Sequence, residues 1–221
     1  MSGNIPNYYQ TLPAKYKGSS HNPGYVAHQI KIPARILICG PSGSFKTNLL
    51  MDILKKFKKT FETVVFCLRN KNQPFYEMIE DKMGDLVEFY DNQIPDMDDY
   101  EEGTNKLIVF DDLLMSDKNI QKQIADYFVR GRHKKFTMIY LSQSFYKTDK
   151  IIRTNCNYIF LLKINSKRDL KLILQEIPIS VDSADELLKI YEEARKGSET
   201  NFLNIDLELN QLKKNYTKVL K

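Results

Sequence analysis

GPSGSFKT, residues 40–47, is the stretch of this 221-residue chain that decides its fold. It fits the phosphate-loop pattern G-x-x-x-x-G-K-[ST] at every position but one, because Phe45 stands where the last glycine should be. In such a loop, successive backbone N–H groups hold phosphate oxygens in one concavity, and the positive end of the following helix adds to the attraction. We therefore expect a nucleotide-binding loop made of Gly40, Pro41, Ser42, Gly43, Ser44, Phe45, Lys46 and Thr47.

Two side chains of this loop have expected chemical roles. The ammonium of Lys46 would neutralise charge on the β- and γ-phosphates of ATP, and the hydroxyl of Thr47 would coordinate Mg²⁺. Phe45 still offers its N–H, but a residue with a side chain adopts a positive φ only at an energetic cost. A degenerate loop that binds no nucleotide is the alternative.

The segments around the loop indicate its structural setting. The apolar run 34–39 predicts a buried strand before the loop, and apolar residues at helical spacing predict a helix over 46–59 after it. The alternation continues, with strands expected at 63–68, 86–90, 107–110, 136–141, 158–164 and 202–207, and helices at 74–83, 119–129, 148–153, 167–175 and 184–196. Strands that are apolar on both faces and alternate with helices indicate a parallel sheet. The expected fold class is α/β, a mainly parallel central sheet with helices on both faces.

The expected organisation is one domain with short additions. An irregular arm is expected at 1–33, the domain at 34–207 and a basic tail at 208–221. Within the arm, residues 25–32 suggest a short strand, and the acidic stretch 96–102 predicts a solvated loop. The length is too small for two ordinary domains.

A pair of carboxylates follows the apolar run 107–110. In a phosphate-loop sheet, the strand beside the loop's own strand ends close to the bound metal, so Asp111 is expected to hold Mg²⁺ directly or through a water. Asp112 would face the γ-phosphate and polarise the attacking water. A solvated turn after a core strand is the alternative.

Gln143 lies at the tip of the next expected strand. The apolar run 136–141 is followed there by the polar residues Ser142, Gln143 and Ser144. An amide there can hydrogen-bond the γ-phosphate or the attacking water and report the state of the nucleotide to the following segment. An ordinary strand-end polar residue is the alternative. The arrangement is that of phosphate-loop ATPases with a strand inserted between the loop strand and the metal strand.

Composition excludes several other classes of protein. Hydrophobic residues make up 42% and charged residues 28%, which argues against disorder and coiled coil. No apolar run approaches the ~20 residues of a membrane-spanning helix, and the polar start suggests no secretory signal. The three widely spaced cysteines predict buried, reduced thiols. A net charge of +5 permits a polyanionic partner without requiring one.

Taken together, these motifs resemble those of the FtsK–HerA superfamily of DNA-pumping ATPases. Within it, the chain is most similar to the genome-packaging ATPases of poxviruses, other nucleo-cytoplasmic large DNA viruses and virophages. The likeness covers roughly residues 34–175 and rests on GPSGSFKT (40–47), LIVFDDLL (107–114), RGRHKKFTMIYLSQSF (130–145) and IIRTNCNYIFLLK (151–163).

The resemblance implies a RecA-like P-loop NTPase with ATP and Mg²⁺ as cofactors. It further implies a homo-oligomeric ring that hydrolyses ATP at its interfaces and drives double-stranded DNA, without sequence preference, into a preformed capsid. A capsid vertex protein would be a further partner, and the location would be the host cytoplasm or the viral factory, or the virion itself. The sequence departs from the superfamily's pattern at two positions. Phe45 stands where glycine is usual, and Asp112 stands where the superfamily usually has Glu.

Such a ring needs a cation supplied by the neighbouring subunit to stabilise charge on the γ-phosphate. The candidates are Arg130, Arg132 and Arg153. We favour Arg130 and Arg132, which we expect at a helix end beside the active edge of the sheet. A basic surface turn is the alternative for each. DNA phosphates could meet basic clusters at 55–59, at 130–135 and in the C-terminal tail, in a contact that salt would weaken.

Two other functions stay open at the level of sequence. A phosphotransferase acting on a nucleotide or a small molecule would need a lid and an acceptor pocket. The aspartate pair, followed by a strand that ends in Gln143, argues against it. A non-hydrolysing, nucleotide-dependent interaction protein is kept open by Phe45.

Overall fold

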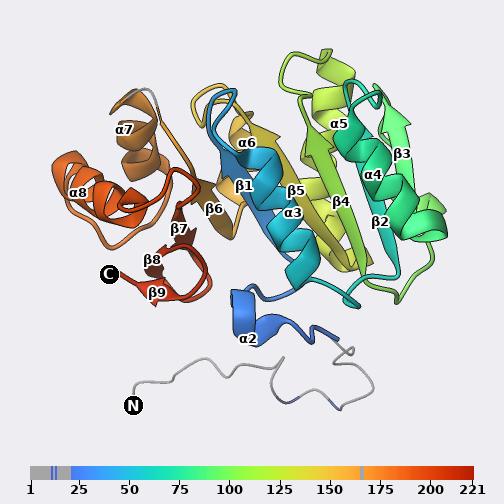
Figure 1. Cartoon of the computed structure of the whole chain (residues 1–221), viewed down its shortest axis with the longest axis horizontal. Coiled ribbons are helices and arrows are strands. Elements are labelled where there is room, and N and C mark those ends of the chain that lie inside the picture. The colour runs from blue at the N-terminus through green and yellow to red at the C-terminus, as the bar shows by residue number, and fades with distance from the viewer. Residues whose placement is uncertain (1–10, 12, 14–20, 165–166) are drawn as a thin grey trace, which may run out of the picture.

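The computed structural model describes Thr11, Pro13 and residues 21–164 and 167–221, and a nine-stranded sheet runs through this part of the chain. The strand order is β3-β2-β4-β5-β1-β6-β7-β8-β9 (Figure 1). Pairing is parallel from β3 to β6 and antiparallel from β6 to β9. The strands are β1 (Arg35–Cys39), β2 (Thr63–Leu68), β3 (Val87–Asp91), β4 (Lys106–Asp111), β5 (Phe136–Ser142), β6 (Tyr158–Leu161), β7 (Leu203–Asp206), β8 (Gln211–Lys214) and β9 (Lys218–Val219).

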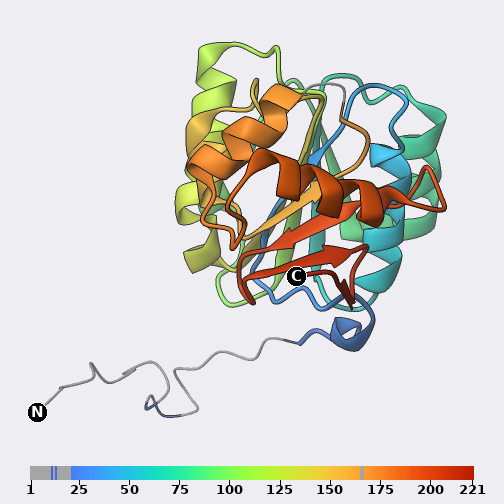
Figure 2. The same ribbon diagram turned by 90° about the vertical axis from the view of Figure 1, so that its left-hand side faces the viewer.

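Helices cover both faces of this sheet (Figures 1 and 2). One face packs against α3 and α4, and the other against α5, α6, α7 and α8. The helices are α2 (Tyr25–His28), α3 (Lys46–Lys56), α4 (Pro74–Met83), α5 (Lys118–Arg130), α6 (Lys150–Asn155), α7 (Lys167–Glu176) and α8 (Ala184–Arg195), with 3₁₀ turns η2 (Gly84–Leu86), η3 (Met97–Asp99) and η4 (Gly131–Lys134). The expected fold class is confirmed, and β5 lies between the loop strand β1 and the aspartate strand β4 as expected.

Local signals explain where the helices begin. Pro74 occupies the first turn of α4, where its missing N–H has no intrahelical partner to lose. The carboxylate of Asp117 accepts hydrogen bonds from the backbone N–H groups of Asn119 and Ile120, both at 2.9 Å, and so caps α5.

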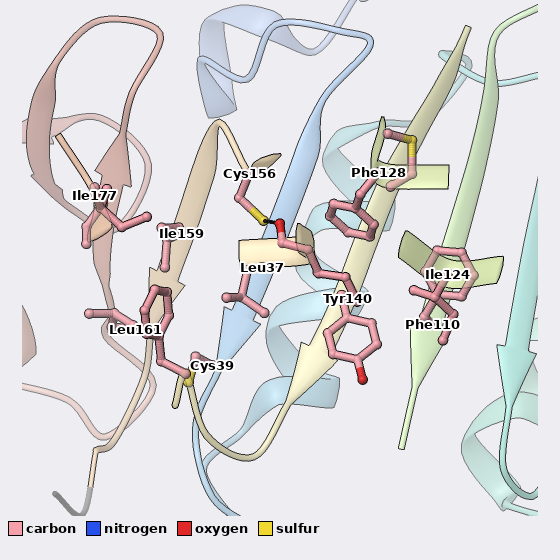
Figure 3. Packing of buried hydrophobic residues seen from close by; sticks show 14 of the residues in the cluster. Leu37, Cys39, Phe110, Ile124, Phe128, Tyr140, Cys156, Ile159, Leu161 and Ile177 are labelled. Atoms are coloured by element: carbon pink, nitrogen blue, oxygen red, sulfur yellow. Dashed lines mark hydrogen bonds between the residues drawn. The ribbon is translucent and has the colours of Figure 1, made fainter. Parts of the chain in front are cut away.

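A row of apolar side chains fixes the register of the central strands. Phe110, Tyr140, Leu37 and Ile159 are paired neighbours on β4, β5, β1 and β6, and all four are fully buried. Figure 3 shows Ile124 and Phe128 of α5 packed on the same side of the sheet. A slip of one residue would turn such a row toward the opposite face, so the packing holds the carboxyl ends of these strands level.

All three cysteines are buried and free, which confirms the expected thiols. Burial raises the pKa of each of these thiols above its ordinary value. None of the helices in the described part of the chain is long and apolar enough to cross a bilayer.

Residues 25–32 do not form the suggested strand. Tyr25–His28 forms the helix α2, which lies against the end of α3. Gly24 permits this contact, because a Cβ at that position would lie 2.0 Å from the carbonyl oxygen of Lys56. The ring of His28 packs edge-on against Phe57, with 4.6 Å between the ring centroids. The expected arm covers residues 1–33. Of these, residues 1–10, 12 and 14–20 lie outside the described part of the chain.

Residues 208–221 do not form the expected separate tail. They contribute the strands β8 and β9 to the sheet. Lys213 is buried and its ammonium lies 2.7 Å from the carboxylate of Asp206, so this lysine is an internal ion-pair partner. Leu212 and Tyr216 are buried as well, each in one of the two core clusters that flank the sheet. Their burial explains why the segment joins the sheet.

The acidic stretch 96–102 is more structured than expected. It contains η3, and Met97 is buried in the core. Asp98 and Glu102 pair with Lys134 at 2.8 and 3.0 Å. The stretch therefore neutralises part of the basic cluster 130–135.

We predict that His28 makes stability depend on pH. Burial, and then the charge of Lys56, hold its pKa at about 4, below the ordinary 6.5. Between these values the unfolded chain binds a proton that the folded chain does not, so the free energy of unfolding should fall as the pH drops from 6.5 to 4. Urea unfolding measured across this pH range should show a smaller decrease in the free energy of unfolding for His28→Leu than for the wild type. The exposed His133→Leu serves as the control, and equal slopes for wild type and His28→Leu would contradict the prediction.

Candidate nucleotide-binding site

The phosphate-loop sequence forms the turn between β1 and α3, at the carboxyl edge of the parallel strands. Gly43 has φ 73°, a left-handed conformation that glycine adopts without strain. Gly40 is needed for space, because a Cβ there would lie 2.4 Å from the hydroxyl oxygen of Ser44. The loop is closed by a hydrogen bond from Ser44 N–H to the carbonyl oxygen of Pro41 at 3.2 Å.

Phe45 takes up the conformation that the pattern normally reserves for glycine. Its φ of 68° and ψ of 23° are left-handed, and it precedes α3 as the N-cap residue. Such a conformation costs an L-residue about 1–2 kcal/mol relative to a right-handed one. The side chain is 36% exposed and lines the cavity described below. The loop thus keeps its shape despite the departure, at a cost in backbone strain.

Lys46 lies over the loop that precedes it. Its ammonium donates hydrogen bonds to the carbonyl oxygens of Gly40 and Pro41, at 2.7 and 2.9 Å. Burial lowers the pKa of this ammonium, while the nearby carboxylates of Asp111 and Asp112 raise it. The positive charge therefore lies between the loop and the two aspartates.

Asp111 is held at the end of β4 by a residue of α4. The hydroxyl of Tyr76 donates a hydrogen bond to one carboxylate oxygen of Asp111. Tyr76 is itself buried, with its ring against Phe66, Phe75 and Phe89. Burial raises the pKa of Asp111, and the Tyr76 hydrogen bond and Lys46 oppose that rise. One carboxylate oxygen is thus fixed in place by an aromatic anchor.

Asp112 and Gln143 lie together at the tips of neighbouring strands. The amide of Gln143 donates to the carboxylate of Asp112 at 3.4 Å, and both residues are exposed. Asp112 has φ 56°, so the backbone turns at this residue and separates its carboxylate from that of Asp111. Asp tolerates this conformation better than most residues.

These groups surround one cavity of about 420 Å³. Its lining includes loop residues 42–47 together with Asp111, Asp112 and Gln143, so the aspartate pair and the strand tip converge on the loop. Gly40 and Pro41 of the expected loop are not among the residues that line it. The volume suits a small-molecule ligand. A threonine hydroxyl and a carboxylate are oxygen ligands of the kind Mg²⁺ prefers, so this donor set fits the ion.

Other parts of the cavity were not expected from the sequence. Asn48, Gln73 and Leu114 also line it, and Tyr76 supports it from behind. No motif marks these positions. The proline that begins α4 was recognisable, but the side of the sheet to which this helix delivers Tyr76 depends on tertiary packing.

Arg130 and Arg132 are not beside the active edge, and this expectation is wrong. They end α5 and begin η4, which precede the amino end of β5, whereas the cavity lies at the carboxyl ends of the strands. The reason is that α5 carries the chain back across the sheet after Asp111. Arg130 also pairs with Asp126 of its own helix.

Arg153 has a structural role within its own chain. It is buried, and its guanidinium donates to the carboxylate of Glu176 at 2.8 Å and to the carbonyl oxygen of Thr148. The pair joins α6 to α7. The guanidinium of Arg132, by contrast, is exposed and has no ion pair or hydrogen bond with any described residue.

Comparison with protein families gives one match. A model of the family described as Poxvirus A32 protein matches residues 68–204, more than half of the chain. No curated protein matches it.

Solved structures share the fold at low sequence identity. The genome packaging NTPase B204 from Sulfolobus turreted icosahedral virus 2, in complex with ATP-gammaS, is 18% identical with a TM-score of 0.57, over 85% of this chain and 99% of that one. The DNA-packaging ATPase B204 from Sulfolobus turreted icosahedral virus is 12% identical with a TM-score of 0.60, over 84% and 98%. ATPases 2 and 3 of EssC from Geobacillus thermodenitrificans are 10% identical with a TM-score of 0.50, over 69% and 36%.

We predict that glycine at position 45 relieves backbone strain. Phe45→Gly and Phe45→Ala both remove the ring, but only glycine removes the penalty of the left-handed backbone. The glycine variant should be more stable than the alanine variant by about 1 kcal/mol in urea unfolding. It should also retain nucleotide binding in calorimetry. Loss of binding in the glycine variant would contradict the assignment of this loop.

We predict that Tyr76→Phe weakens Mg²⁺ binding at the nucleotide site. Loss of one hydrogen bond worth about 0.5–1.5 kcal/mol should raise the Mg²⁺ concentration needed to enhance ATP-analogue binding by roughly threefold to tenfold. Tyr127→Phe is the matched control, because its hydroxyl donates to the Pro95 carbonyl oxygen away from the site. An equal Mg²⁺ requirement in the two variants would show that Tyr76 does not position Asp111.

Proposed function

Because the chain belongs to the Poxvirus A32 protein family, we propose that it is an ATP-hydrolysing motor that moves double-stranded viral DNA into a preformed capsid. The observation that carries this proposal is the convergence of Lys46, Thr47, Asp111, Asp112 and Gln143 on one cavity. The B204 proteins, named as a genome packaging NTPase and a DNA-packaging ATPase, support it through their shared fold.

The chain's own residues have distinct tasks in this proposal. The loop N–H groups and the Lys46 ammonium bind the phosphates, and Thr47 and Asp111 would hold Mg²⁺, which neutralises phosphate charge. Asp112 accepts a proton from the attacking water, since its carboxylate is exposed at the cavity. The Gln143 amide, 3.4 Å from that carboxylate, orients the same water.

A ring of identical subunits would supply the remaining cation from a neighbour. Among the candidates, Arg132 is the one whose guanidinium is free of partners in the described part of the chain. Arg130 would first have to release Asp126, and Arg153 would have to break a buried pair. We therefore assign the role in trans to Arg132. Such a ring would work on a capsid vertex, in the host cytoplasm or the viral factory.

A second candidate is a nucleotide-dependent interaction protein that does not hydrolyse ATP. The strained Phe45 favours it, because a loop with altered backbone preference could bind nucleotide without reaching the geometry for hydrolysis.

We predict ATP hydrolysis that rises when duplex DNA is added, in a protein that sediments as a ring. Asp112→Asn should lower kcat by roughly 10²–10⁴-fold while ATP still binds, because only the proton acceptor is lost. Arg132→Ala should lower kcat steeply while ATP binding is retained. Arg130→Ala is the comparison variant, and its kcat should fall less, because the role in trans is assigned to Arg132. ATP binding without turnover in the wild-type ring would favour the second candidate, and turnover that needs a small acceptor would favour a phosphotransferase.

A further inference from the structure

A second cavity, of about 690 Å³, lies between α3 and α4 at the opposite edge of the sheet. Its floor contains Val64 and Leu107, which are paired at the amino ends of β2 and β4. The walls are apolar, with Met51 and Leu54 from α3 and Met83 from the end of α4. The two helices lie side by side on the near face in Figure 1. We call this cavity the α3–α4 groove.

The rim of the α3–α4 groove combines an apolar anchor with unpaired positive charge. Leu86 is 52% exposed at its edge. Four exposed lysines line the rim, and none makes an ion pair or a hydrogen bond through its ammonium to a described residue. They are Lys55, Lys58, Lys59 and Lys82. No acidic side chain is among the described residues that line the groove.

The chain's other basic cluster, residues 130–135, is partly neutralised by acidic side chains of the chain itself. Lys134 pairs with Asp98 and Glu102, and Arg130 pairs with Asp126. On α3 itself, Lys56 lies 3.6 Å from Asp52, on the i,i+4 spacing. The lysines of the groove have no such partners, so their charge is available to the carboxylates of another molecule.

We propose that the α3–α4 groove binds an acidic amphipathic segment of a partner protein. Carboxylates of the segment would meet the lysines of the rim, while its apolar side chains would cover Leu86 and the floor over Val64 and Leu107. Helix-in-groove recognition uses this combination of apolar anchors and charged flanks. The inference concerns a surface away from the nucleotide site and does not rest on the proposed ATPase activity.

Charge and burial argue against three other occupants. Residues 1–20 of the chain contain Lys15 and Lys17 and no acidic residue, so they do not complement the rim. The acidic stretch 96–102 of a second copy offers carboxylates, but its Met97 is 4% exposed and cannot serve as an apolar anchor. DNA phosphates could meet the lysines, but the apolar floor would gain nothing from them.

The probe for a test is a labelled synthetic helix of about 16 residues, with Glu along one face and Leu along the other. Its binding would be measured by fluorescence anisotropy on the full chain. The triple charge reversal Lys55→Glu, Lys58→Glu and Lys59→Glu should weaken binding by at least about tenfold. The matched control reverses Lys118, Lys122 and Lys189, three exposed lysines outside the groove, and should change the affinity by less than about twofold. All six positions are exposed, so folding should be preserved.

Leu86→Ser separates a docking groove from a merely basic surface, because it removes the exposed apolar anchor without changing the charge of the rim. It leaves the four lysines in place and should still weaken binding several-fold. A scrambled peptide of the same composition should bind the wild-type chain poorly. Equal binding of the scrambled peptide, equal loss in the control triple, or no binding at all would overturn the proposal. If a short DNA duplex displaced the peptide and lost affinity only in the groove triple, the surface would belong to nucleic acid instead.

Discussion

The parallel register of β4, β5 and β1, which brings their carboxyl ends to the same height, is the constraint on which the rest of the molecule depends. Three segments distant in sequence supply the loop, the aspartates and the glutamine, and each follows a different strand. Only a parallel register, held by the row of Phe110, Tyr140 and Leu37, brings their ends to one edge. The hydrophobic core thus determines the geometry of the polar groups at this edge of the sheet.

Much of this arrangement could be predicted from the sequence, because each element has a local signal. Apolar runs of the right length identified the parallel strands, and the bounds expected at 63–68 and 74–83 agree with the structure. The cavity lining was predictable for the same reason, since the loop pattern and the strand-end polar residues are contiguous in sequence. Phe45 was recognisable as a departure, and its left-handed backbone follows from the position it occupies.

What the sequence did not reveal depends on contacts between distant segments. Tyr76 has no motif of its own, and its hydrogen bond to Asp111 exists because α4 packs across β2. The positive charge of Lys213 suggested a solvated tail, but its partner Asp206 lies on the neighbouring strand. The expected position of Arg130 and Arg132 was wrong because α5 returns the chain from the carboxyl end of β4 to the amino end of β5, and no local sequence signal marks that direction.

The helix α3 connects the nucleotide cavity and the α3–α4 groove. Its first residues belong to the nucleotide loop and its last turn borders the groove, a span of about 16 Å for its length. Coupling between two binding sites is always reciprocal. Any occupant of the groove that moves α3 and changes the affinity for nucleotide by some factor must have its own affinity changed by nucleotide by the same factor. Under that condition, each cycle of ATP binding and hydrolysis would alternately raise and lower the affinity of the groove for its partner.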